Sequence, residues 1–263
     1  MERSFCDMSH EEVYELLEVL HDKYNNEEFI AADPISVPHS FTAEGDIEIA
    51  GFLAATIAWG NRRMIVQSAH RMMRYMDNQP RDFVLNASEG DMAYLSSYVH
   101  RTFNGGDFQD FVRGMRHIIE EWGSVGGFFE HHYIESGDVR KAISAFRREF
   151  FSVPHDKHSE KHLSSIDRGA ACKRIAMYMR WFVRRDDRGV DFGQWQKIPM
   201  SALYLPLDIH TGRMGRAMGL LQRKQDDWKA VEEITASLRE FCPEDPTRYD
   251  YSLFGAGIAK LFD

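Results

Sequence analysis

Hydrophobic residues recur along most of the chain at helical rather than alternating spacing. Near the start, Ser9 and Glu12 have the spacing of a capping box, which marks the beginning of a helix. The apolar stripe behind them consists of Val13, Leu16, Leu17, Leu20 and Tyr24. The pattern therefore predicts an amphipathic helix over about residues 10–24.

The same pattern predicts eight further helices. They are expected at residues 47–59, 62–76, 108–122, 139–151, 170–185, 208–219, 227–241 and 247–262. Because aspartate is a preferred N-cap, five of these starts are assigned to Asp46, Asp107, Asp138, Asp208 and Asp226. Residues 32–45, 154–165 and 186–206 are expected to be loops, and Gly105-Gly106 and Gly126-Gly127 to mark turns or helix ends. With no clear strand pattern, the expected class is all-α, a single helical domain over residues 1–263 with two lobes.

Composition limits the environment of the protein. No apolar run reaches the length of a membrane span, since the longest candidate, residues 47–59, contains Glu48. The first residues lack an apolar signal core, so a cytoplasmic protein is expected. Three scattered cysteines, Cys6, Cys172 and Cys242, exclude a four-cysteine iron–sulfur cluster within one chain. Cys172 is expected to be a small buried thiol.

The distribution of charge is uneven. The formal net charge of −9 by itself argues against a nucleic-acid partner. Residues 168–188, however, contain seven cations and two acids, a net charge of +5, which leaves −14 on the rest. Such an island is typical of a local phosphate-binding face, and a solvated helix with internal ion pairs is the alternative.

Two segments have the composition of reactive sites. Lys173 falls in the first turn of its expected helix, where the helix dipole disfavours a cation. Desolvation there would lower its pKa and make the neutral, nucleophilic amine accessible; the alternative is an ordinary surface lysine. Asp208, in Leu205-Pro-Leu-Asp-Ile-His, is expected to cap a helix and, compatibly, to face a cleft where its carboxylate activates a nucleophile.

This combination of a lysine-bearing helix with a downstream Leu-Pro-Leu-Asp-Ile-His segment resembles the helix-hairpin-helix (HhH-GPD) DNA glycosylases. It is most similar to the archaeal 8-oxoguanine glycosylase type, and the chain looks like a bacterial member of that ancestry. Where such enzymes have a glycine-rich hairpin, this chain has Asp167-Arg-Gly-Ala-Ala. The resemblance covers a glycosylase-like core over about residues 46–262, preceded by an N-terminal extension of about residues 1–45.

The resemblance implies a set of roles. Lys173 would attack the sugar C1′ as a nucleophile that forms a Schiff base, and Asp208 would assist it. A flipped base, with 8-oxoguanine the first to test, would enter a pocket formed by Asp250, Phe254 and Trp59. The DNA-binding residues would be Asn61, Arg62, Arg168, Arg174 and Arg213. The implied partner is double-stranded DNA with a damaged base, bound by a monomer without a cofactor.

Alternatives remain open at this level. The segment His155-Asp-Lys-His-Ser-Glu-Lys-His162 has the composition of a metal site, but nothing in the sequence establishes its geometry, so a polar loop is expected and no metal ligand is assigned. A catalytically inactive nucleic-acid-binding protein of the same fold is one alternative function. A helical interaction or metal-binding module without a DNA role is the other.

Overall fold

The computed structural model describes residues 8–259, which form two compact units. The terminal unit comprises residues 8–29 and 166–259, and the middle unit comprises residues 30–165. The helices of the terminal unit are α1 (His10–Tyr24), α10 (Lys173–Val183), α11 (Ile209–Ala217), α12 (Trp228–Phe241) and α13 (Asp250–Ile258). Its 3-10 turns are η6 (Ile166–Arg168), η7 (Met200–Ala202) and η8 (Pro246–Tyr249), and α2 (Glu27–Ile30) lies at the unit boundary.

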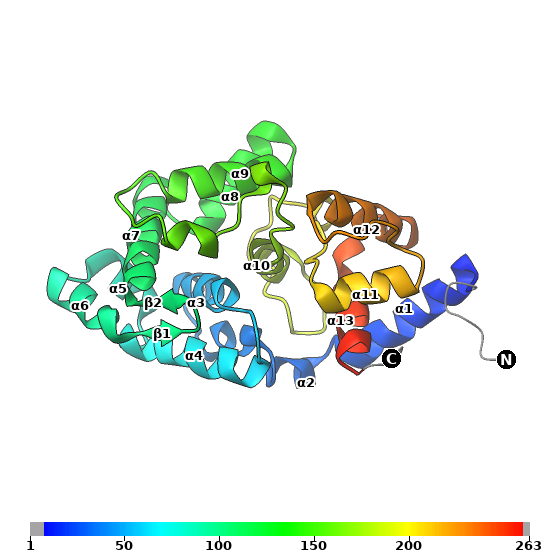
Figure 1. Cartoon of the computed structure of the whole chain (residues 1–263), viewed down its shortest axis with the longest axis horizontal. Coiled ribbons are helices and arrows are strands. Elements are labelled where there is room, and N and C mark those ends of the chain that lie inside the picture. The colour runs from blue at the N-terminus through cyan, green and yellow to red at the C-terminus, as the bar shows by residue number, and fades with distance from the viewer. Residues whose placement is uncertain (1–7, 260–263) are drawn as a thin grey trace. The chain divides into compact units, whose positions relative to one another are not determined.

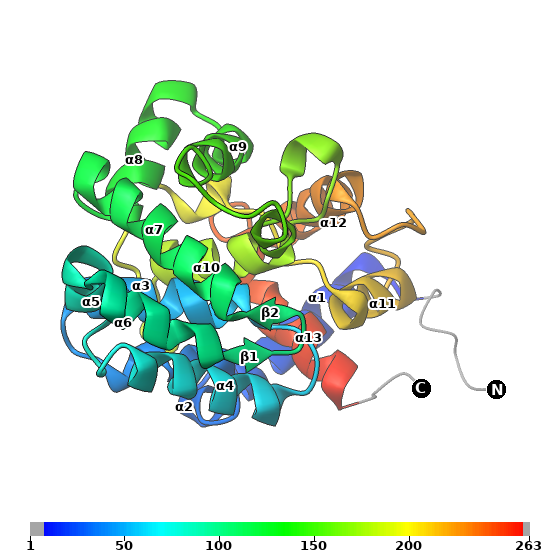
Figure 2. The same ribbon diagram turned by 60° about the vertical axis from the view of Figure 1, so that its left-hand side comes forward.

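The middle unit is also helical. Its α-helices are α3 (Glu44–Thr56), α4 (Arg62–Tyr75), α5 (Pro80–Asn86), α6 (Glu89–Tyr94), α7 (Gly105–Trp122), α8 (Val125–Ser136) and α9 (Val139–Phe150). Its 3-10 turns are η2 (Pro34–Ser36), η3 (Pro38–Ser40), η4 (Leu95–Ser97) and η5 (Ser159–His162). Strands β1 (Val99–His100) and β2 (Phe103–Asn104) form a short antiparallel hairpin beside the start of α7 (Figure 2). The predicted helical class is confirmed.

The terminal unit is formed by two segments, residues 8–29 and 166–259, that are far apart in the sequence. Helix α1 packs on α13, which also contacts α11 (Figure 1). Val13, Leu17 and Leu20 are buried on the predicted stripe of α1, and the predicted capping box of Ser9 and Glu12 is present. The expected division into an extension of about residues 1–45 and a core of about residues 46–262 stays a prediction. Residues 8–29 join the C-terminal part of the chain because their apolar stripe is buried against α13.

The middle unit is built around α3, which is buried on all its faces from Ile47 to Thr56. Glu48 lies within this apolar helix, and its carboxylate accepts hydrogen bonds from the amides of Val125 (2.9 Å) and Gly126 (2.7 Å). These amides belong to the first turn of α8, where no intrahelical acceptor is available. A residue that interrupts the apolar run thus joins α3 to α8, and its negative charge suits the positive end of the α8 dipole.

Several predicted boundaries differ from the structure. Asp46 does not cap α3, which begins at Glu44; its carboxylate instead accepts from the Arg81 amide of α5. Asp107 is the third residue of α7, in a capping box with the N-cap Asn104. Gly126-Gly127 lies inside α8 rather than in a turn, because the Glu48 carboxylate and the Ser124 cap satisfy the first amides of that helix.

Other boundaries shift by a few residues. Helix α12 is capped by Asp227, one residue later than predicted, because the Asp227 carboxylate reaches the Ala230 amide. The last predicted helix divides into η8 and α13, and its predicted end at residues 260–262 lies outside the described residues. Among residues 8–259, no helix combines the length and the apolar composition needed to cross a membrane.

Candidate active site

Lys173 and Asp208, 35 residues apart in sequence, lie together in the terminal unit. Lys173 Nζ is 3.3 Å from Asp208 Oδ2, and both side chains are partly exposed, at 26% and 16%. Lys173 is the first residue of α10, and Asp208 is the N-cap of α11. The starts of two helices therefore bring a primary amine and a carboxylate into contact at a position that solvent still reaches.

The two oxygens of the Asp208 carboxylate make different contacts. Oδ1 accepts from the amides of His210 (2.8 Å) and Thr211 (2.9 Å), which caps α11, while Oδ2 faces Lys173. Burial by itself would raise the pKa of Asp208, but the Lys173 ammonium and the helix amides outweigh it and hold the pKa below its usual value. The carboxylate is therefore ionised throughout the neutral range.

The backbone before Lys173 determines where the amine lies. Turn η6 is followed by Gly169, with φ of +79°, and Cys172 adopts φ of +51°, which is uncommon for a residue with a side chain. The Gly169 carbonyl accepts from the Trp228 amide at 2.9 Å, which ties this segment to the start of α12. The helix begins at Lys173 rather than at Ala170 because Cys172 is left-handed, and the Cys172 thiol is buried as predicted.

The charges of Lys173 and Asp208 both influence the pKa of Asp250, but Asp250 has an ion-pair partner of its own. Its buried carboxylate forms an ion pair with Arg180. Burial raises the pKa of Asp250 to about 6. The Arg180 guanidinium opposes this rise, and the negative charge of Asp208 adds to it. The base-reading role of Asp250 stays a prediction, and the structure adds Arg180 as a residue that holds this carboxylate.

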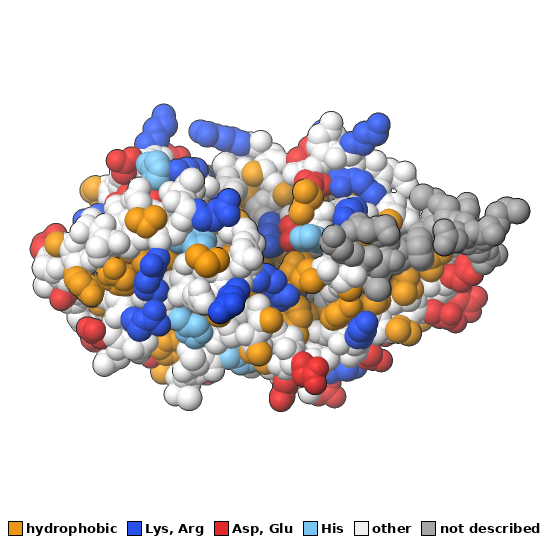
Figure 3. Space-filling view, turned by 60° about the horizontal axis from the view of Figure 1, so that its bottom comes forward, with side chains coloured by type: hydrophobic (Ala, Val, Ile, Leu, Met, Phe, Trp, Pro, Cys, Tyr) orange, Lys and Arg blue, Asp and Glu red, His pale blue; other side chains and the backbone are white. Residues whose placement is uncertain are grey.

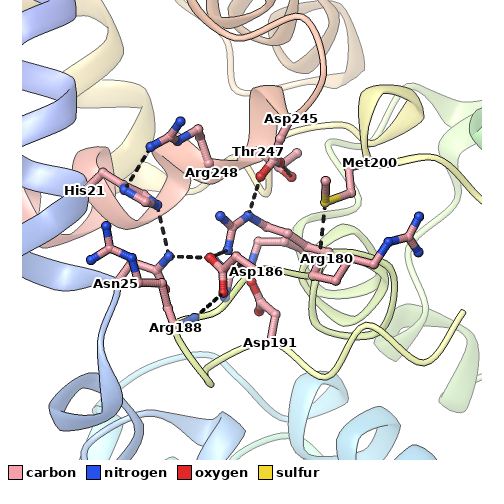
Figure 4. Close-up of polar contacts among 12 residues, drawn as sticks. His21, Asn25, Arg180, Asp186, Arg188, Asp191, Met200, Asp245, Thr247 and Arg248 are labelled. Carbon is pink, nitrogen blue, oxygen red and sulfur yellow. Dashed lines mark hydrogen bonds and ion pairs between the residues drawn. The ribbon is translucent and has the colours of Figure 1, made fainter. Parts of the chain in front are cut away.

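A buried ion-pair network continues from Arg180 (Figure 4). Arg184, which is 2% exposed, contacts three carboxylates at 2.7–3.1 Å. They belong to Asp186, Asp191 and Asp245. Both guanidinium groups lie over the Tyr251 ring, at 4.3 and 5.5 Å from its centre. The network connects α10 to the following loop and to the segments around η8 and α13.

This network corrects the interpretation of the basic island. Arg180 and Arg184 contribute to its +5 charge, yet both are buried against acids, three of which, Asp191, Asp245 and Asp250, lie outside the 168–188 window. A window of sequence counts charges only along the chain, whereas the fold brings carboxylates from other segments. The face that remains for phosphate is smaller than the sequence suggests.

The other predicted cations of this unit differ in exposure. Arg168 is exposed in η6, and Arg213 is exposed on α11, with a hydrogen bond to the Gly257 carbonyl at 3.2 Å. Arg174 is only partly exposed, and burial lowers its pKa to about 10. Arg168 and Arg213 are therefore more accessible than Arg174. Phe254, on α13, is partly exposed and meets the His210 ring edge-on at 6.3 Å.

Another buried group of this unit, His21, responds to pH. Its Nδ1 accepts from Arg248 at 3.2 Å, and its Nε2 lies 2.9 Å from the Asn25 amide nitrogen (Figure 4). Burial, followed by the charges of Arg248, Arg184 and Arg188, lowers the pKa of His21 to about 4. Because the folded state resists protonation, the stability that His21 confers is full above pH 6.5 and is lost as the pH falls toward 4.

We expect His21→Gln to remove the part of the pH dependence of stability that His21 causes. In the wild type, the free energy of unfolding should fall by roughly 3 kcal/mol between pH 7 and pH 4 through His21 alone. Burial also lowers the pKa of His70, His100 and His132, so the variant should show a shallower slope rather than none. Urea unfolding at four pH values measures the slope. A control, His131→Gln, changes an exposed histidine, and an equal effect of both variants would contradict the assignment.

Three predicted residues belong to the middle unit and are described within it. Trp59 stacks on His162 (ring centres 5.6 Å apart, 24° between planes) and meets His100 edge-on. Asn61 is the exposed N-cap of α4, and its side chain accepts from the Met64 amide. Arg62 forms an ion pair at 2.8 Å with the buried Asp33. Asn61 is thus accessible for a DNA contact, whereas Arg62 already holds the segment before α3.

The sequence analysis missed a basic pocket of about 560 Å³ in this unit. Its charged lining residues are the arginines Arg71, Arg74 and Arg101, which lie beside Asn61 and His100. Figure 3 shows lysine, arginine and histidine side chains on the face of the middle unit that carries α4. Spacing along α4 could have indicated part of this pocket, because Arg71 and Arg74 are three residues apart and share a face. Arg101 joins them only through the β1–β2 turn, where its φ is +56°.

The histidine-rich segment is not a loose polar loop. His158 and His162, at the two ends of a turn that includes η5, both approach Asp107 of α7. One ligand atom from each of the three lies within 4.8 Å of the others. Of the groupings of histidine, cysteine and acidic residues within residues 8–259, this one has the arrangement needed to hold a metal ion.

The fold and site define a helical protein with an accessible lysine–aspartate pair at two helix starts. Residues 33–259 match the model of the family described as protein of unknown function (DUF2400), and the chain belongs to this family. A search of curated proteins and a search of solved structures both find no match.

Proposed function

We propose that this protein is a DNA glycosylase with lyase activity that excises an oxidised purine, such as 8-oxoguanine, through a Schiff base on Lys173. The observation that carries the proposal is the 3.3 Å contact between Lys173 Nζ and Asp208 Oδ2. An amine nucleophile and the group that activates it must lie within hydrogen-bond reach. The resemblance of both segments to helix-hairpin-helix glycosylases supplies the reaction class.

The chemistry assigns one task to each group. Lys173 must lose a proton to Asp208 or to solvent before its lone pair can attack C1′ of the flipped nucleotide. As the Nζ–C1′ bond forms, the bond between C1′ and the base breaks, and the departing base takes up the proton that Lys173 gave up, so that Asp208 is ionised again. The ionised Asp208 stabilises positive charge that develops on the sugar. The C1′–O4′ bond then breaks as the Nζ=C1′ bond forms, and the ring oxygen, which stays on C4′, takes up a proton from Nζ. From this Schiff base, loss of a C2′ proton together with the 3′ phosphate nicks the strand.

Other residues would bind the substrate. Phe254 offers a partly exposed ring on α13, about one turn from Asp250 at the start of that helix. Trp59 belongs to the middle unit, where its ring contacts His100 and His162, and its role in base binding stays a prediction. The basic pocket of Arg71, Arg74 and Arg101 has the charge that a DNA phosphate requires. Arg168 and Arg213 are further phosphate contacts in this proposal.

The test is reductive trapping. The protein is incubated with a duplex that contains one 8-oxoguanine in the presence of borohydride, which reduces a Schiff base to a stable amine. We expect a covalent protein–DNA adduct with the wild type and the damaged duplex, and none with the undamaged duplex. Lys173→Gln should abolish the adduct, because glutamine has no nucleophilic amine.

A matched control keeps the assignment specific. Lys229, the second residue of α12, is an exposed lysine in the first turn of another helix of this unit, and Lys229→Gln should leave trapping unchanged. An adduct that persists in Lys173→Gln would assign the nucleophile to another amine. No adduct on 8-oxoguanine or on a panel of other lesions would overturn the lyase mechanism. Salt-dependent duplex binding without an adduct would then favour the inactive DNA-binding protein.

A further inference from the structure

A compact cluster in the middle unit lies outside the proposed chemistry. His158 Nδ1 is 2.7 Å from Asp107 Oδ1, and His162 Nε2 is 3.3 Å from Asp107 Oδ2. The side chains of Asp107 and His162 are 1% and 2% exposed, whereas that of His158 is 42% exposed. Two potential ligands, Asp107 and His162, are therefore buried inside the unit, and the third, His158, is accessible to solvent.

The surroundings hold these side chains in place. Ser159 Oγ lies within hydrogen-bond distance of both Asp107 (2.9 Å) and Asp110 (2.7 Å). Asp107 also accepts from the Asn104 amide at 2.8 Å. The His162 ring is packed between Trp59 (5.6 Å, stacked) and Phe103 (4.9 Å, edge-on). Hydrogen bonds to the carboxylate and packing of the ring are the features that orient metal ligands in proteins.

The charges of the cluster also favour a cation. Asp107 and Asp110 are two buried carboxylates that share one serine hydroxyl. Arg113 lies 3.0 Å from Asp110, while Asp107 faces the two imidazoles, and its ion pairs within residues 8–259 include no arginine or lysine. Burial would raise the pKa of Asp107, but hydrogen bonds from Asn104, His158 and Ser159 hold it below its usual value. Asp107 is thus ionised and able to coordinate a metal at neutral pH.

We propose that Asp107, His158 and His162 form a binding site for a divalent transition metal of the zinc class. Two imidazoles and one carboxylate are a ligand set that Zn²⁺ and Co²⁺ accept, with a fourth position left for water. Ligands about 2 Å from one ion are separated by roughly 3–3.5 Å in tetrahedral geometry, and the two contacts to Asp107 are close to this range. The site goes beyond the proposed glycosylase function and needs none of its residues to react.

Metal binding at this site is coupled to protons. Lys161 Nζ lies 2.6 Å from His158 Nε2, and an ammonium can only donate, so the His158 proton is on Nδ1 and points at Asp107. A metal that binds Nδ1 displaces this proton, and it also requires a neutral His162. Binding of the metal should therefore release this proton. The bound ion would join the 154–165 segment to the start of α7.

The experiment titrates chelator-treated, full-length protein with Zn²⁺ by calorimetry and with Co²⁺ by visible absorption. We expect one ion per chain at pH 7.5, a Kd below about 10 µM, and Co²⁺ bands typical of four ligands. Fluorescence of Trp59, which stacks on a ligand, should change in the same titration. His158→Ala removes the most exposed ligand and should weaken binding at least about tenfold, because only two protein ligands remain.

The matched control is His155→Ala. His155 belongs to the same segment but bonds the Val153 carbonyl rather than Asp107, so its loss should leave the affinity for Zn²⁺ unchanged. Urea unfolding of both variants shows whether each is folded. Equal weakening in the two variants would overturn the site, as would weak, multi-site binding by the wild type. Trapping of DNA by the metal-free protein is read separately, so failure of this site leaves the glycosylase proposal intact.

Discussion

Asp208→Asn is expected to lower the single-turnover rate of the proposed excision by about 100-fold to 1,000-fold. The change preserves the shape of the side chain, and asparagine is as good an N-cap as aspartate. Its Oδ1 can still accept from the His210 and Thr211 amides, whereas a neutral amide replaces the carboxylate oxygen 3.3 Å from Lys173. Activation of the amine and stabilisation of the sugar cation are lost, while the fold is retained.

The measurement is excision of 8-oxoguanine with enzyme in excess, together with thermal unfolding. Asp227→Asn is the matched control, because Asp227 is also an N-cap with a cation as partner, Arg223, on the α12 side of the same unit. Both variants should lose no more than about 1 kcal/mol of stability. Only Asp208→Asn should lose activity. Comparable rates for the two variants would show that the contact between Lys173 and Asp208 is merely structural.

Arg184→Met is expected to destabilise the terminal unit by about 3–5 kcal/mol. Methionine fills much of the volume of the arginine stem, but it leaves Asp191 and Asp245 buried without their main counter-ion. An uncompensated buried charge costs far more than the ion pair itself contributes. Urea unfolding of the wild type and of the variant at pH 7.5 measures this loss of stability.

Two comparisons test the physical reason. Arg188→Met removes an ion pair between two exposed side chains, Arg188 (36% exposed) and Asp22 (64% exposed). It should cost less than about 1 kcal/mol of stability. Burial already raises the pKa of Asp245, with Arg184 opposing it, so loss of Arg184 should raise that pKa further. The Asp245 carboxylate then becomes neutral as the pH falls, and the deficit of Arg184→Met should shrink between pH 7.5 and pH 5. A pH-independent deficit would indicate lost packing instead.

The sequence alone predicts much of the local structure. Helices α1 and α9 are capped by Ser9 and Asp138, as capping chemistry predicts, and α4 begins at Arg62, as apolar periodicity predicts. Helix α8 was missed, since its first turn contains Gly126 and Gly127 and its amides are capped by Glu48, 77 residues away from Val125. Short helices such as α5 and α6 were also missed, because one or two turns carry too little periodicity to detect.

The same division holds for the sites. Lys173 and Asp208 could be singled out from their segments, because a cation at a helix start and an N-cap aspartate are local features. Their 3.3 Å separation depends on how α10 and α11 pack. The basic island was overestimated, since the acids that neutralise Arg180 and Arg184 include Asp245 and Asp250, more than 60 residues further along the chain.

The histidine-rich segment shows the opposite error. Its spacing is compatible with a metal site, but the third ligand, Asp107, is about 50 residues away and serves locally as part of a helix cap. By itself the sequence determined the helical class, most helix positions and the candidate amine and carboxylate, because these depend on propensity, capping and periodicity over a few residues. Only the tertiary structure decided which charges are buried, which are paired and which side chains share a site, because burial and pairing depend on segments that are distant in sequence and meet only in the folded chain.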